Sequence, residues 1–105
     1  MVIARVAPEA TAIGRHLAEL VGDSAGVSEL FVHQQHGTVR LWLIAAPPDL
    51  DAEHELYAAA ASIRRAFPEQ YFEFFLLQCH QYPDGVDLHE LIPTDAEQIP
   101  LRRMG

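Results

Sequence analysis

The chain has 105 residues, of which 50% are apolar and 21% are charged, a composition typical of one small globular domain. Its 15 acidic residues outnumber its 7 basic residues and give a formal net charge of −8, which disfavours binding to the phosphate backbone of nucleic acids. No apolar run approaches the roughly 20 residues that a membrane-spanning helix needs, and the N-terminal segment lacks the apolar centre of a signal peptide.

The single cysteine, Cys79, excludes an internal disulfide bond and a structural zinc site built from several thiolates. An unpaired cysteine fits most simply in a reducing compartment. We therefore expect a cytoplasmic protein with neither a membrane nor a nucleic-acid partner.

The first expected element is a helix over residues 8–21. Pro8 suits the first position of a helix, and Gly22 follows the segment as a natural C-terminal stop. One apolar stripe recurs at helical spacing, formed by Ala10, Ile13, Leu17, Leu20 and Val21.

Two strands are expected next, over residues 27–34 and 38–45, because both segments are rich in β-branched and aromatic residues. The short connector between them contains His36 and Gly37, and glycine accepts the positive φ that a tight hairpin requires. Pro47 and Pro48 end the second strand, because proline cannot donate a hydrogen bond to a sheet.

A second helix is expected over residues 49–67, capped by Asp49 or Asp51 and stopped by Pro68. An aromatic-rich strand follows over residues 71–79. A short helical turn is expected within residues 86–93, and the tail over residues 93–105 contains a possible edge strand at 99–103.

This order predicts a single two-layer α+β domain, α-β-β-α-β, over residues 1–105. The third strand should lie parallel to the second, since a helix connects them. Both helices should then cover one face of a small mixed sheet.

The second face of that sheet is the most informative feature of the sequence. Alternation along the strands places large apolar side chains on the face away from the helices, and large exposed apolar patches mark interfaces. We expect a homodimer through this face, although the C-terminal tail folding over it is the open alternative. The predicted interface residues are Phe31, Trp42, Ile44, Phe75 and Leu77.

Histidines are the candidate metal ligands, because imidazole suits zinc, copper and nickel. A divalent transition-metal site would need at least three ligands to converge, and no HExxH or CxxC motif is present. We therefore expect no cofactor, and we expect these histidines to lie at the ends of helices and strands. The histidines considered for such a site are His33, His36, His54 and His80.

Catalytic chemistry has little support. Cys79 and His80 are adjacent on a strand and should point to opposite faces, so we expect Cys79 to be a small buried residue. His89 lies near Asp84, Asp87 and Glu90 in a late loop, where solvation is the simpler interpretation. Neither a GxSxG elbow nor a glycine-rich phosphate loop occurs.

Two resemblances to known families arise. Residues 26–80 resemble the cytoplasmic domain of cation diffusion facilitator transporters through Gly26, Val27, Asp49, Leu50, His54 and His80. That resemblance implies a dimeric, metal-binding β-β-α-β core with His54 and His80 as ligands. The latter half is similar to short, stand-alone bacterial proteins of unknown function through Pro93, Asp95, Ala96, Ile99 and Arg102. This second resemblance implies an ordered tail and no particular function.

The leading hypothesis is a non-enzymatic, self-associating α+β domain that acts as an interaction or regulatory protein. The alternative is a transition-metal-binding sensor or chaperone domain on the same fold. A small hydrolase-like enzyme comes third, and it would require a deep pocket that gathers either His89, Asp87 and Glu90 or Cys79.

Overall fold

A computed structural model of the chain describes residues 8–83 and 85–101. The elements follow the order α1 (Pro8–Val21), β1 (Val27–Gln35), β2 (Thr38–Ala45), α2 (Leu50–Ala66), β3 (Tyr71–Gln78), the 3-10 turns η1 (Cys79–Gln81) and η2 (Leu88–Leu91), and β4 (Glu97–Ile99).

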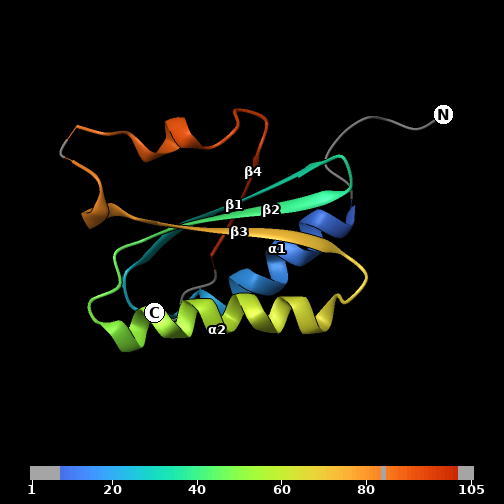
Figure 1. Cartoon of the computed structure of the whole chain (residues 1–105), viewed down its shortest axis with the longest axis horizontal. Coiled ribbons are helices and arrows are strands. Elements are labelled where there is room, and N and C mark those ends of the chain that lie inside the picture. The colour runs from blue at the N-terminus through green and yellow to red at the C-terminus, as the bar shows by residue number, and fades with distance from the viewer. Residues whose placement is uncertain (1–7, 84, 102–105) are drawn as a thin grey trace.

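The strands form one four-stranded mixed sheet in the order β3-β2-β1-β4. β1 is antiparallel to both β2 and β4, whereas β3 is parallel to β2. Figure 1 shows both helices on one side of the sheet and the segment between β3 and β4 on the other side. The predicted α+β fold class is confirmed, and so is the parallel pairing of the third strand with the second.

The boundaries of α2 follow from its end residues. The Asp49 side chain accepts a hydrogen bond from the Ala52 backbone N–H at 2.8 Å, which satisfies one of the free donors of the first turn. Arg64 and Arg65 lie in the last turn, where the negative end of the helix dipole favours cations. Pro68 follows two residues after the helix ends.

α1 lies close to the sheet because of a glycine. A Cβ atom at Gly14 would lie 2.9 Å from Ile99 Cγ1, so a larger residue would displace the Ile99 side chain or move α1 away from β4. Leu20 was expected in the buried stripe but is 45% exposed, because the stripe turns toward the opposite flank of the helix. The buried apolar residues of α1 are Ala10, Ile13, Leu17, Ala18 and Val21.

The predicted hairpin between β1 and β2 is confirmed. His36 and Gly37 form its tip with φ angles of 52° and 81°, so two successive residues adopt the left-handed conformation. This matches the right-handed twist of the flanking strands. The turn fixes a register in which Gln35 pairs with Thr38 and Phe31 pairs with Trp42.

The main core lies between the helices and the sheet. The strand alternation expected from the sequence is confirmed on this face, since the side chains of one parity on β1 and β2 are almost completely buried. The buried strand residues of this core are Val27, Leu30, Val32, Val39, Leu41, Leu43, Ala45 and Ile99, and Phe72, Phe74 and Leu76 of β3 pack partly buried against them.

The tail strand lies earlier in the chain than expected. β4 covers Glu97–Ile99, whereas the prediction was residues 99–103, of which 102 and 103 lie outside the described residues. Pro100 follows the strand and has no N–H to extend the ladder with β1. No helix in the described part of the chain is long and apolar enough to cross a membrane.

Candidate functional site

The second face of the sheet carries a small core of its own. Trp42, Ile44 and Leu77 are buried there against Leu88 and Ile92. The last two residues belong to the segment 79–96, which we call the C-terminal cover. Figure 1 shows the cover crossing the sheet on the side opposite the helices. Phe31, Tyr82 and Ala96 pack around this core.

Burial changes how the predicted interface must be understood. Three of its residues, Trp42, Ile44 and Leu77, are buried within the single chain, and Phe31 is half-buried. The open apolar face that motivated the prediction is therefore covered. The alternative expected the tail over residues 93–105 to cover it, whereas the buried covering residues, Leu88 and Ile92, precede that tail. Of the five residues, Phe75 stays on the surface, where it is 37% exposed and stacks on Trp42 with ring centroids 5.4 Å apart.

Two pairs of histidine and carboxylate side chains hold the cover on the sheet. His89 Nε2 of η2 lies 2.7 Å from Glu29 Oε2 of β1. His33 Nε2 of β1 lies 3.1 Å from Asp95 Oδ2 at the far end of the cover. Both contacts join residues about 60 positions apart in the chain. The cover is thus fixed to β1 at two points in its second half, residues 89 and 95.

His89 contacts a second carboxylate besides Glu29. Its Nδ1 also lies 2.9 Å from Asp87 Oδ1, so both ring nitrogens face carboxylates. Ionised carboxylates only accept hydrogen bonds, so the geometry favours an imidazolium with two N–H donors. The hydrogen bonds to Asp87 and then to Glu29 raise the pKa of His89 above its usual value. The hydrogen bond to His89 lowers the pKa of Asp87 in turn.

This cluster brings together part of the set considered for an enzyme. Asp87 and His89 meet as expected for that alternative, and Glu29 joins them from β1. The His89 side chain is 53% exposed, however, and lies on the surface rather than in a deep pocket. The two carboxylates position His89, which connects the cover to Glu29 of β1.

The four histidines considered as metal ligands lie in different surroundings. His33 is buried beside Asp95, His36 is exposed at the hairpin tip, His54 is exposed on α2, and His80 is exposed in η1. The described residues contain no group of three or more histidine, cysteine or acidic side chains that could hold a metal ion.

Cys79 differs from its prediction. It was expected to be buried, but it is a free, exposed thiol at the first position of η1. The reason is that β3 ends at Gln78, which takes the buried position and donates a hydrogen bond to Glu53 Oε1 at 2.6 Å. The strand alternation on which the prediction depended stops one residue earlier.

The two edges of the sheet are built differently. β4 forms one edge with only three residues and is followed by Pro100, an arrangement that discourages pairing with another strand. β3 forms the other edge with eight residues, YFEFFLLQ, and within the described chain it pairs with β2 alone. Tyr71 is 77% exposed on this edge. Figure 1 shows β3 running along the near side of the molecule.

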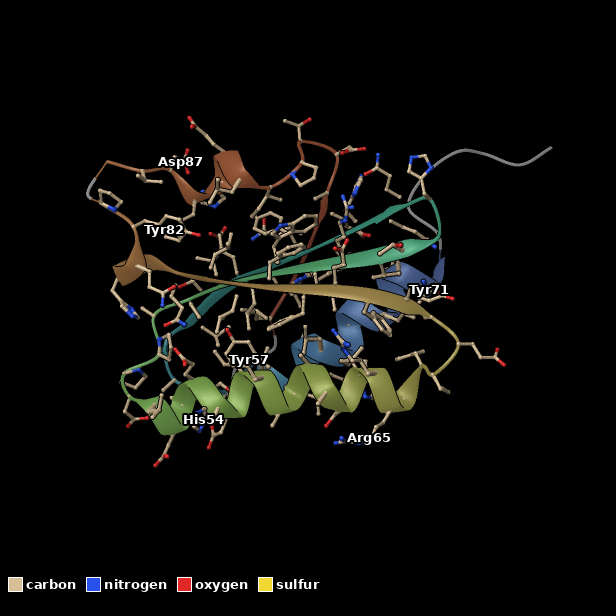
Figure 2. The ribbon with its side chains drawn as sticks, viewed as in Figure 1. His54, Tyr57, Arg65, Tyr71, Tyr82 and Asp87 are labelled. Atoms are coloured by element: carbon tan, nitrogen blue, oxygen red, sulfur yellow. The ribbon has the colours of Figure 1, made fainter. Side chains whose placement is uncertain are left out.

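A groove runs between this open edge and α2. It has a volume of about 370 Å³, and it is lined by Tyr57, Ala60, Ala61, Arg64 and Phe74. The Tyr57 and Phe74 rings meet edge to face at 6.0 Å. Figure 2 shows Tyr57 reaching from α2 toward the strand and Tyr71 at the start of β3.

We call β3 together with this groove the β3 edge. Sequence reasoning missed it as a site, because the sequence did not show that β4 pairs with β1 and leaves β3 as the open edge. The aromatic density of residues 71–75 was the available signal.

Comparisons of the chain with protein-family models, with curated proteins and with solved structures found no match. The two family resemblances therefore stay predictions.

Proposed function

We propose that this protein is a non-enzymatic interaction domain that self-associates, and that the contact is made by the β3 edge rather than by the covered face of the sheet. The observation that carries the proposal is an eight-residue aromatic strand at an open sheet edge. Unpaired backbone N–H and C=O groups on such a strand are a ready template for another strand.

The side chains on this edge support an interaction surface. Tyr71, Phe75 and Tyr57 are all exposed, although aromatic residues are enriched at protein interfaces. The one charged residue of β3, Glu73, accepts a hydrogen bond from Arg40 Nε at 2.7 Å. A free charge on an edge strand discourages pairing with another strand, and this ion pair reduces that effect of Glu73.

We also propose a cytoplasmic setting and no nucleic-acid partner. The exposed thiol of Cys79 suits a reducing compartment, and the net charge of −8 repels phosphate backbones. The metal-binding alternative has no gathered set of ligands among the described residues to support it.

Sedimentation velocity from about 1 to 100 μM tests self-association, a range in which standard interfaces are commonly populated. We expect a species at twice the protomer mass of 11.7 kDa. The double variant Tyr71→Lys/Phe75→Lys should shift the equilibrium to monomer. Leu20→Lys/Leu91→Lys is the matched control, because it places the same two charges on exposed apolar residues of α1 and η2. A wild-type protein that stays monomeric throughout would overturn the proposal.

A further inference from the structure

We infer that two copies of this chain join strand to strand, with β3 pairing antiparallel to the partner's β3 about a two-fold axis normal to the sheet at Phe74 or Phe75. The two sheets then become one continuous sheet, and α2 lies beside the partner's α2. This inference rests on the proposed self-association and adds its geometry.

The first argument is the difference between the two edges. The short β4 strand with its following proline is protected, whereas the β3 edge offers the full length of a regular strand. A strand edge is most completely satisfied by another strand of similar length. β3 itself has the right length, and a two-fold axis brings the same surface of both copies together.

The second argument is the register. In an antiparallel pair, residues directly opposite each other point to the same face of the sheet. Two identical strands related by an axis normal to the sheet can meet this condition only if one residue lies opposite its own copy, with the axis between the two. An axis at Glu73 would set two carboxylates directly opposite each other, which is destabilising. An axis at Phe74 or Phe75 avoids this, and it also gives the longest overlap of Tyr71–Gln78 with its copy.

The third argument is the charge distribution of α2. Its first turn carries Asp51 and Glu53, and its last turn carries Arg64 and Arg65. Helices related by this axis run antiparallel, so the acidic end of each lies toward the basic end of the other. A parallel arrangement would oppose like charges, which matters for chains of net charge −8.

The groove beside β3 completes the surface. Ala60 and Ala61 leave room between α2 and the strand, while Tyr57 and Phe74 supply apolar area. The small residues permit the two α2 helices to approach, and the groove accepts side chains from the partner. The unpaired backbone and the charge distribution at this edge therefore both suit a second copy of the same surface.

Cys79 provides a test that needs no substitution. It is the only cysteine, it is exposed, and it directly follows β3. In the proposed dimer, nitroxide labels on the two Cys79 residues lie at opposite ends of the paired strands, about 3 nm apart at ~3.3 Å per residue. Pulsed electron–electron double resonance on the labelled wild-type dimer should show this distance between the two nitroxides. A dimer with no component near 3 nm would overturn the inference.

Disulfide trapping in a Cys79→Ser background gives an independent readout. Phe74→Cys or Phe75→Cys should cross-link to its own copy, because residues at the axis face each other at a distance that a disulfide spans. Tyr71→Cys is the matched control on the same strand, and it should not cross-link, because antiparallel pairing separates the two copies of that residue.

The outcomes separate the two proposals. A monomeric wild-type protein refutes self-association itself. A monomer is the result expected if the β3 edge binds an extended segment of a different protein. A dimer that cross-links at none of the three positions, or equally at all three, retains self-association and refutes the antiparallel β3 pairing.

Discussion

His89 Nε2 and Glu29 Oε2 lie 2.7 Å apart, although the two residues are 60 positions apart in the chain. This contact fastens the C-terminal cover to β1 directly above the second core. Phe31 of β1 packs edge to face on the same imidazole, with centroids 5.9 Å apart. The position of His89 is therefore fixed by a charge contact and a ring contact together.

The pKa of His89 should lie above 6.5, and its carboxylate partners should be the cause. Asp87→Asn should lower the pKa of His89 most, because its hydrogen bond makes the largest contribution, and Glu29→Gln should lower it less. NMR titration of the imidazole protons measures this directly.

Stability should depend on pH in two directions. Because folding raises the pKa of His89, its stabilising contribution is complete below about pH 6.5 and is lost as pH rises through the raised pKa. The pKa values of Asp87 and Asp95 are lowered, chiefly by their hydrogen bonds to His89 and His33, so their contributions are present above about pH 3.8 and are lost on further acidification.

We expect the urea midpoint to fall between pH 5.5 and pH 8.5, and to fall less in His89→Gln. The paired control is His54→Gln, which should keep the wild-type difference. An unchanged pH dependence in His89→Gln would contradict a role of this residue in fastening the cover.

Ile92→Ala should loosen the cover. Ile92 is buried against the Trp42 core, and truncating a buried isoleucine costs about 2–5 kcal/mol of unfolding free energy. Since Trp42 is the only tryptophan, its emission should also shift to longer wavelength as water reaches the ring. Leu91→Ala is the neighbouring control, because Leu91 is 48% exposed and its truncation should change stability by less than about 0.5 kcal/mol.

Gly26 and Gly37 form a matched pair for a backbone test. Both have positive φ, 82° and 81°, so alanine at either position meets a similar conformational penalty of about 1–2 kcal/mol. A Cβ atom at Gly26 would overlap the Ala46 carbonyl group, whereas one at Gly37 meets no atom within 4 Å. Gly26→Ala should therefore lower the unfolding free energy by at least about 1 kcal/mol more than Gly37→Ala in chemical denaturation. Equal losses of unfolding free energy in the two variants would contradict this prediction, because they would show that the backbone at residues 26 and 46 can move apart without a cost in stability.

Much of the fold could be predicted because its signals are local. Asp49 caps α2 and Pro68 follows it, and the hairpin at Gly37 forms where a short connector separates two apolar runs. The alternation that buries Leu41 and Leu43 under the helices also places Trp42 and Ile44 on the opposite face. These features depend on residues a few positions apart.

The candidate site could not be predicted in the same way. The contact between His33 and Asp95 joins β1 to a segment that lacks helical or strand periodicity. No local sequence pattern therefore predicts this contact. Leu88 and Ile92, which cover Trp42, lie in and just after a single 3-10 turn. The exposure of Cys79 likewise depended on the residue at which β3 ends.

The sequence by itself determined the helices, the strands, the hairpin and the two faces of the sheet, because backbone preference and side-chain periodicity act over short distances. Only the tertiary structure decided that the cover occupies the second face and that β4 pairs with β1, which leaves β3 as the open edge. Both outcomes depend on contacts between distant segments, whose free energy is set by packing and charge pairing in the assembled fold.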